Sequence, residues 1–163
     1  SLNKTLRKQR YHVTMDAAFP EVIQACSEPR QYSDGTWITA EMIDAYIHLH
    51  ELGYAHSVES WEGDHLVGGV YGIALGKIFF GESMFSRQTD ASKVAFVHLV
   101  NQLKCWGFQL IDCQVENPHL VGLGSTNISR PQFKALLQQH IPALDHLRTT
   151  VQPKWSLNLQ HCV

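Results

Sequence analysis

The sequence predicts an α/β (α+β) fold in which helices flank a mixed, mostly antiparallel sheet. Three short β-type runs, at residues 55–61, 65–73 and 77–80, follow one another with only turn sequences between them. A helical segment and an apolar run at residues 108–115 come next, and such a strand–helix–strand crossover makes its two strands parallel. The 163 residues, 44% of them hydrophobic, can build one core, so we expect a single domain over residues 1–163.

Two helices are predicted before the first strand. One covers residues 19–26 and ends before Pro29, and a loop follows at residues 31–35. The other begins after Thr39, which can cap it, and continues to Gly53. Its apolar residues recur at helical spacing: Met42, Ala45, Tyr46 and Leu49.

The helix between the last two strands should begin at Asp90, a suitable N-cap, and end at Gly107. Its apolar face consists of Phe96, Leu99, Val100 and Leu103. A final helix is predicted over residues 131–140. An antiparallel meander that leads into a strand–helix–strand unit resembles the acetyltransferase-like fold called GNAT, so we expect a GNAT-like fold.

Charge offers little general attraction to polyanions, since the net charge is −2 and the pI is about 6.5. One basic segment is present at residues 1–10, and it holds Lys4, Arg7, Lys8 and Arg10 without an acidic residue. This segment is either a phosphate-binding arm or a solvated terminus. On charge alone the solvated terminus is favoured.

The cysteines and the hydropathy predict a cytoplasmic protein that does not enter a membrane. Cys26, Cys105, Cys113 and Cys162 form no Cys-x-x-Cys pair, which argues against a disulfide framework or a zinc knuckle. No apolar run approaches the ~20 residues of a membrane span. Because the chain starts at Ser1 and not at Met, we expect that a natural N-terminal part precedes it.

The histidines do not predict a metal site. His48 and His50 are two apart on a predicted helix and so point in different directions. His50 and Glu51 are followed by His56, which is not the spacing of a His-Glu-x-x-His site. We expect no metal, and structural hydrogen bonding for His56 and His119.

A long motif distinguishes the chain from others with this layout. Residues 81–87, Gly-Glu-Ser-Met-Phe-Ser-Arg, precede Ala-Ser-Lys at 91–93 and Asp-Cys-Gln at 112–114. Residues 35–38 and 49–59 precede that motif, and later matches include His119, Leu123-Gly124 and Ile128-Ser129-Arg130. In this order, from about Tyr11 to Phe133, the motifs resemble those of bacterial leucyl/phenylalanyl-tRNA–protein transferases.

Coenzyme A is not expected as the donor. GNAT enzymes that use it hold its pyrophosphate on a glycine-rich turn at the start of the helix after the fourth strand. Here residues 86–93 read Ser-Arg-Gln-Thr-Asp-Ala-Ser-Lys and contain no glycine. The backbone therefore cannot approach a pyrophosphate in that way.

The resemblance implies a defined reaction. Such enzymes transfer Leu, Phe or Met from aminoacyl-tRNA to acceptor proteins with N-terminal Arg or Lys, which marks the product for N-end rule degradation. The reaction is aminolysis of an ester and needs no metal or nucleotide cofactor. The site must deliver a neutral amine and stabilise an oxyanion.

The catalytic candidates are Glu82, Asp112 and Gln114. Strand alternation puts Asp112 and Gln114 on one face, and Glu82 and Met84 on one face, so adjacent parallel strands could present the three polar residues around one cleft. Glu82 would bind the transferred residue's amino group while Asp112 orients Gln114, which either relays a proton or positions the acceptor. The alternative is that Asp112 and Gln114 only satisfy loop amides.

The resemblance also implies two substrate-binding regions. The flexible apolar pocket for the transferred side chain would be lined by Val70, Phe79, Met84, Leu99 and Ile111. The alternative is that all five are core residues, and for Leu99 and Ile111 the two interpretations have equal weight. Trp37 would offer a flat surface to the terminal adenosine of tRNA. Lys93, together with the basic segment, would contact tRNA phosphates, or Ser92-Lys93 would only cap the helix.

Two departures from the family pattern remain. The family has a further small N-terminal lobe that this chain lacks, and residues 149–163 are left unassigned, including Trp155. Two alternative functions stay open: a GNAT-fold N-acyltransferase that uses another acyl donor, and a tRNA-binding module without catalysis.

Overall fold

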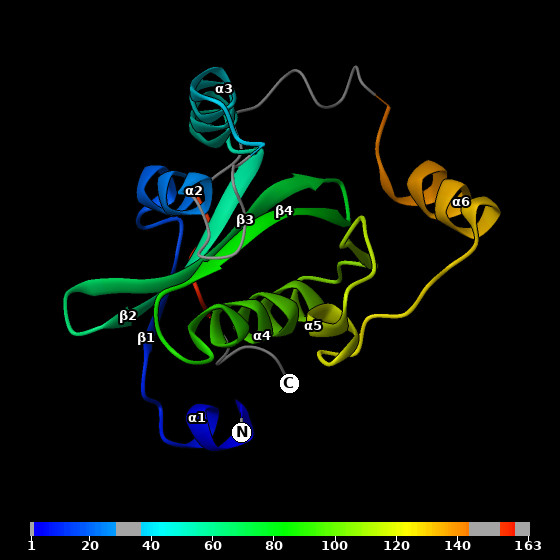
Figure 1. Cartoon of the computed structure of the whole chain (residues 1–163). Coiled ribbons are helices and arrows are strands. Elements are labelled where there is room, and N and C mark those ends of the chain that lie inside the picture. The colour runs from blue at the N-terminus through cyan, green and yellow to red at the C-terminus, as the bar shows by residue number, and fades with distance from the viewer. Residues whose placement is uncertain (1, 29–36, 144–153, 159–163) are drawn as a thin grey trace.

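A five-stranded sheet in the order β1-β2-β3-β4-β5 forms the centre of the computed structural model, which describes residues 2–28, 37–143 and 154–158 (Figure 1). Neighbouring strands from β1 to β4 are antiparallel, and β4 and β5 are parallel. The strands are β1 (His12–Met15), β2 (Ala55–Glu62), β3 (His65–Leu75), β4 (Ile78–Ser86) and β5 (Leu110–Asp112). The mixed, mostly antiparallel sheet is confirmed, although β4 is longer and β5 shorter than predicted.

Helices cover both faces of this sheet (Figure 1). The helices α2 (Phe19–Ser27) and α3 (Ala40–Glu51) lie on one face, and α4 (Ala91–Cys105) lies on the other. The short α1 (Leu2–Arg7) packs against α4, and α5 (Pro118–Val121) follows β5. The last helix, α6 (Arg130–His140), has no fully buried residue. The loop predicted at residues 31–35 lies outside the described residues.

Two glycine turns connect the central strands as predicted. Gly63 and Gly76 have φ angles of +58° and +57°, a conformation that side-chain-bearing residues rarely adopt. Gly76 also lies against the end of α6, because Lys77 N–H donates to His140 O at 3.0 Å. A Cβ at Gly76 would lie 2.0 Å from that same oxygen, so only glycine fits there.

Residues 2–15 contain more regular structure than the sequence indicated. Leu2 and Leu6, four apart, place the apolar side of α1 against a cluster that contains Tyr11, Val67 and Val94. β1 pairs with β2 at the edge of the sheet. Residues 2–7 of the basic segment therefore form a docked helix, and the cationic side chains of Lys4, Arg7, Lys8 and Arg10 remain exposed.

Helix capping follows the prediction at α3 but not at α4. The Thr39 hydroxyl accepts the Met42 N–H at 3.3 Å, as predicted. Asp90 has a left-handed backbone and makes no capping bond, so its predicted role is wrong. The hydroxyl of Ser86, at the end of β4, instead accepts the Ser92 N–H at 3.2 Å.

A buried carboxylate supports α2, which has no local side-chain cap. Glu59 on β2 is 0% exposed and accepts hydrogen bonds from the hydroxyls of Ser57 and Thr14. It also binds the main chain at Ala17 and Ala18, just before α2. Burial outweighs these bonds and raises the pKa of Glu59.

The tail left unassigned by the sequence contributes an aromatic anchor. The Trp155 ring stacks on His56 with ring centroids 3.6 Å apart, and it contacts Phe79, Trp106 and Phe108. The main-chain N–H of Trp155 donates to the buried Asp16 carboxylate at 2.6 Å. Residues 154–158 are thus tied to the core beside α4.

The cysteines differ from the sequence expectation in one respect. Of the described cysteines, Cys26 and Cys113 form no disulfide, whereas Cys105 is disulfide-bonded. Cysteine spacing alone did not indicate this bond. Among the helices of the described ranges, none has the length and apolarity that a bilayer crossing requires.

Candidate active site

Glu82 occupies a β-bulge in β4. Tyr71 of β3 pairs with Ser83, and the next pair joins Gly72 to Gly81, so Glu82 is an extra residue without a partner in β3. Bulges of this kind redirect side chains and occur often beside active sites. Here the bulge gives Glu82 an orientation that regular alternation would not.

The Glu82 carboxylate is bound on the α3 side of the sheet. The Tyr46 hydroxyl is hydrogen-bonded to it, and burial together with the Glu82 charge raises the pKa of Tyr46 to about 12. Met84, in contrast, packs against the cluster on the α4 side. The expectation that Glu82 and Met84 share one strand face is therefore wrong, because the bulge interrupts the alternation between them.

Asp112 and Gln114 lie where β5 ends. β5 pairs with β4 only as far as Asp112, and Gln114 has a φ angle of +62°, so it does not continue the strand. The Asp112 carboxylate accepts the main-chain N–H of Gln114 at 2.8 Å. The Gln114 side-chain amide donates to Gly81 O at 3.0 Å. Asp112 thus orients Gln114 through its main chain, and Gln114 is tied to the residue before Glu82.

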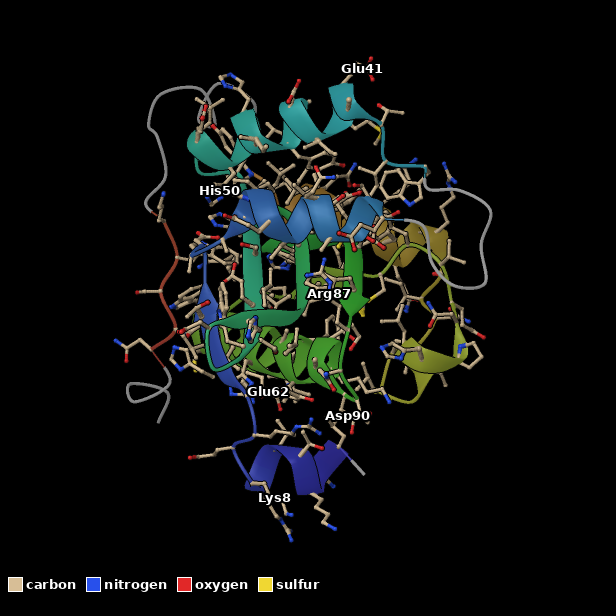
Figure 2. All side chains as sticks on the ribbon, turned by 60° about the vertical axis from the view of Figure 1, so that its left-hand side comes forward. Lys8, Glu41, His50, Glu62, Arg87 and Asp90 are labelled. Atoms are coloured by element: carbon tan, nitrogen blue, oxygen red, sulfur yellow. The ribbon has the colours of Figure 1, made fainter. Side chains whose placement is uncertain are left out.

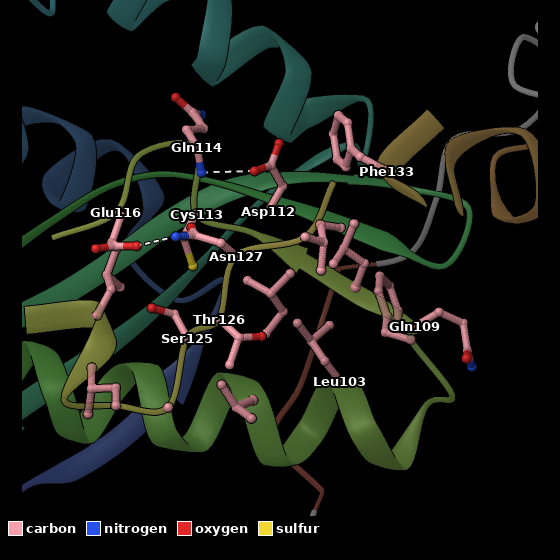
Figure 3. A pocket seen from close by; sticks show the side chains of 18 of the residues that line it. Leu103, Gln109, Asp112, Cys113, Gln114, Glu116, Ser125, Thr126, Asn127 and Phe133 are labelled. Atoms are coloured by element: carbon pink, nitrogen blue, oxygen red, sulfur yellow. Dashed lines mark hydrogen bonds between the residues drawn. The ribbon is translucent and has the colours of Figure 1, made fainter. Parts of the chain in front are cut away.

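Two cavities meet at this point. The first, here called the β4 cleft, has a volume of about 1310 Å³ and lies along β4 beyond the bulge. The second, the α4 cavity, measures about 740 Å³ and lies between α4 and residues 109–130 (Figure 3). Phe96, Cys113 and Leu120 line both. Figure 3 shows Asp112 and Gln114 along one edge of the α4 cavity, across from Leu103 of α4.

The predicted catalytic residues are divided between these cavities. Glu82 lines the β4 cleft, whereas Asp112 and Gln114 line the α4 cavity. They lie on or directly after two adjacent parallel strands, but they do not surround the single cleft that was predicted. Cys113 stands between them, and burial raises the pKa of its thiol.

The predicted substrate-binding residues are divided as well. Trp37, Val70 and Met84 line the β4 cleft, and Trp37 is 54% exposed. Ile111 lines the α4 cavity. Phe79 and Leu99 are 1% exposed and line neither of these two cavities; they belong to the core between the sheet and α4.

Within the described part of the chain, some of the basic residues form ion pairs and others do not. Lys4 and Arg7 on α1, and Lys8 directly after it, are exposed; α1 lies near the start of α4, as the positions of Lys8 and Asp90 in Figure 2 show. The Thr5 hydroxyl bonds Asp90 at 3.3 Å and joins the two helices. Two of the predicted cations have acidic partners at 3.2 Å: Arg10 with Glu62, and Lys93 with Asp90.

Several residues around the β4 cleft were given no site role from the sequence. Tyr46 was interpreted only as part of an apolar helix face. Arg87, visible between α2 and α4 in Figure 2, bonds both oxygens of Glu28 at 2.9 and 3.0 Å. His119 lines the cleft, and burial together with the Lys93 charge lowers its pKa. Only their place in the fold identifies these residues.

His50 and His56 are buried histidines that bond the framework. His56 Nδ1 lies 2.8 Å from Asp16 Oδ2, and Nε2 lies 3.0 Å from Gly53 O. His50 Nδ1 lies 2.8 Å from Ala55 O, and its ring stacks on Phe19. In the part of the chain that the structure covers, no group of three or more metal-binding side chains is found.

Comparison of the fold agrees with the layout of the sheet. An aminoglycoside acetyltransferase from an uncultured soil metagenomic sample, solved in complex with trehalose, superposes with a TM-score of 0.50. The match covers 88% of this chain and 97% of the acetyltransferase, at 9% sequence identity. The likeness concerns the fold alone and supports a GNAT-like architecture.

Comparison of the sequence gives a narrower assignment. Residues 1–138 match the family description "Leucyl/phenylalanyl-tRNA protein transferase". A leucyl/phenylalanyl-tRNA–protein transferase of Stutzerimonas stutzeri is 58% identical over 141 residues, which cover 86% of this chain and 62% of that protein. One from Cellvibrio japonicus is 58% identical over 84% of this chain and 58% of its own length.

The chain thus spans about three fifths of the length of these curated relatives. The chain belongs to the leucyl/phenylalanyl-tRNA–protein transferase family.

Proposed function

We propose that this chain carries the catalytic site for transfer of Leu, Phe or Met from aminoacyl-tRNA to proteins with an N-terminal Arg or Lys. The product would be a substrate of N-end rule degradation, and the need for charged tRNA implies a cytoplasmic reaction. The observation that supports the proposal is the junction at the bulge of β4. There the main-chain oxygen of Gly81, the residue before Glu82, accepts the Gln114 side-chain amide at 3.0 Å, and this bond links Gln114 in the α4 cavity to the strand that carries Glu82 into the β4 cleft.

The chemistry asks little of a general base. An α-amino group with a pKa of about 7.7–8.0 is partly neutral at physiological pH, and the aminoacyl ester is already activated. Positioning the amine against the ester carbonyl can therefore supply most of the rate enhancement. Rigidly held polar groups suit this task better than a strong base.

Glu82, Asp112 and Gln114 have separate roles in this proposal. Glu82 accepts hydrogen bonds from the amino group of the transferred residue. Gln114 offers its side-chain oxygen to the attacking amine, because its amide nitrogen is already bonded to Gly81 O. Asp112 acts on Gln114 through the main-chain bond and holds it in the left-handed conformation.

The two cavities suit the two parts of the donor. The exposed Trp37 in the β4 cleft offers a stacking surface for the terminal adenosine of tRNA. The transferred side chain would occupy the junction, with Met84 on one side, Ile111 on the other and Phe96 lining both. Walls of this kind favour a flexible or aromatic apolar side chain.

The basic residues would contact the tRNA backbone outside the cleft. Lys4, Arg7 and Lys8 are free of acidic neighbours among the described ion pairs and would make the main phosphate contacts. Arg10 and Lys93 would first have to leave Glu62 and Asp90, so we expect a smaller contribution from each.

The start of α4 supports a donor other than coenzyme A. Its first N–H groups already have partners, since Ala91 N–H donates to Gln88 O at 3.1 Å and Ser92 N–H to the Ser86 hydroxyl. A pyrophosphate would have to displace these bonds. A GNAT-fold N-acyltransferase that uses coenzyme A would be stabilised against heat by that ligand, which we do not expect here.

The test is transfer of labelled leucine from charged tRNA to a peptide that begins with Arg. It is made with the chain alone and with a chimera that adds the N-terminal lobe of the Stutzerimonas stutzeri relative. We expect transfer at least by the chimera, with a loss of about 10²-fold or more in Glu82→Ala and Gln114→Ala. Glu51→Ala is the matched control, because Glu51 is exposed on α3.

The possible outcomes distinguish the proposed activity, a non-catalytic function and the assignment of the site residues. No transfer by either form would contradict the proposed activity, and binding of charged tRNA without transfer would favour a non-catalytic tRNA-binding module. Full transfer by both Glu82→Ala and Gln114→Ala would contradict the assignment of the site residues but not the proposed activity.

A further inference from the structure

The hydroxyl of Tyr71 is buried without a partner. Tyr71 lies on β3, is 0% exposed, and carries the only buried side-chain nitrogen or oxygen atom in the described residues that makes no hydrogen bond. Phenylalanine would fill the same space without leaving a polar group unsatisfied, which costs roughly 1–3 kcal/mol. Stability therefore does not explain why tyrosine, and not phenylalanine, stands at this position.

Its surroundings connect Tyr71 to Glu82. Because the bulge follows the Tyr71–Ser83 pair, Glu82 is the strand neighbour directly beside Tyr71. The Tyr71 ring meets the Tyr46 ring edge-on, with centroids 5.4 Å apart, and the Phe19 ring at 5.8 Å. Tyr46 already bonds the Glu82 carboxylate, so the two tyrosines and the carboxylate form one group.

The electrostatic surroundings keep the Tyr71 hydroxyl a donor. Burial raises its pKa, and the Cys26, Tyr46 and Glu82 groups raise it further. A neutral hydroxyl among acidic neighbours has one hydrogen to give, and a carboxylate with two oxygens accepts several bonds. Glu82 is the anionic acceptor among these neighbours.

We propose that Tyr71 is a positioning residue that acts through Glu82. When Glu82 binds the substrate amino group, its carboxylate accepts the Tyr71 O–H in addition to the Tyr46 O–H. The two tyrosines then fix the carboxylate from behind while its front faces the amine. The inference rests on the proposed function and adds to it a residue that lines neither cavity.

The test is Tyr71→Phe, which removes one oxygen and keeps the ring. We expect the melting temperature to stay equal or rise, since an unsatisfied hydroxyl is lost. The kcat for leucine transfer should fall about tenfold, while the KM for aminoacyl-tRNA changes less than about twofold. A merely structural hydroxyl would give the opposite pattern, with lower stability and unchanged kcat.

Tyr11→Phe is the matched control. Tyr11 is also buried, but its hydroxyl donates to Thr89 O at 2.8 Å. Losing that bond should lower the melting temperature and leave kcat unchanged. In a Glu82→Gln background, Tyr71→Phe should cause no further loss of kcat, because the group through which it acts is already altered.

Three results would overturn the inference. The first is a parent-like kcat in Tyr71→Phe, and the second is a melting temperature that falls together with kcat. The third is a full multiplicative loss in the double variant. All three require that the unaltered form transfers leucine; if it does not, the proposed function fails and this inference fails with it.

Discussion

Trp155→Ala should unfold the protein at a distinctly lower temperature. The indole stacks on His56 and touches Phe79, Trp106 and Phe108, so its removal leaves a hole between β4, α4 and the following turn. Truncation of a buried Trp costs about 3–5 kcal/mol, and each aromatic pair is worth roughly 0.5–1.5 kcal/mol. Because Trp155 is half-buried, we expect about 2–4 kcal/mol of lost unfolding free energy.

The assay is urea unfolding followed by circular dichroism, with a thermal scan beside it. At this chain length a loss of that size lowers the melting temperature by roughly 5–15 °C. The slope of the unfolding transition should stay the same, since only stability changes. A loss below about 1 kcal/mol would refute the reasoning that residues 154–158 are packed into the core.

Trp37→Ala is the matched control, because it removes the same side chain from an exposed position. Its unfolding free energy should change by less than about 0.5 kcal/mol. If Trp37 stacks on the terminal adenosine, the KM for aminoacyl-tRNA should rise about tenfold, since such stacking is worth roughly 1–3 kcal/mol. We therefore expect Trp155→Ala to lower the stability and Trp37→Ala to weaken the binding of aminoacyl-tRNA.

Two further predictions concern buried and capping groups. The pKa of Glu59 is raised from 4.5, so the folded state binds this proton more tightly than the unfolded state, and stability falls as pH rises from 4.5 through the raised pKa. Glu59→Gln has no group that titrates at this position. Urea unfolding across that pH range should therefore show the unfolding free energy of the variant rising relative to that of the parent as pH rises. A difference that does not change with pH would contradict the assignment. Ser86→Ala should cost about 1 kcal/mol of unfolding free energy, and Asp90→Ala less, because Ser86 makes the capping bond to α4. A larger loss of stability in Asp90→Ala than in Ser86→Ala, measured by thermal unfolding, would identify Asp90 as the cap.

The central strands and flanking helices could be predicted from local sequence. Alternating side chains and the turns at Gly63 and Gly76 determine the β2–β3–β4 meander, and each signal acts over only a few residues. Thr39 likewise caps a helix within its own turn. β1 was missed because four residues with two polar side chains give little pattern.

The details of the site depend on contacts that local sequence does not contain. A bulge at Glu82 is visible only from the register of β4 against β3. The turn at Gln114 depends on its left-handed backbone and its bond to Gly81 O, a contact across 33 residues. The motif identified Glu82, Asp112 and Gln114, but alternation alone gave them the wrong relative orientation.

The extra residue in β4 couples the folding of one hairpin to the placement of the reacting groups. Deleting Glu82 would close the bulge and restore a regular ladder, in which Gly81 stays opposite Gly72 and Ser83 stays opposite Tyr71. Met84 would keep its place on the α4 side, whereas the carboxylate beside the Tyr46 hydroxyl would be lost. The length of this strand is thus under the same constraint as the identity of Glu82, because a deletion that closes the bulge removes the position at which the carboxylate stands.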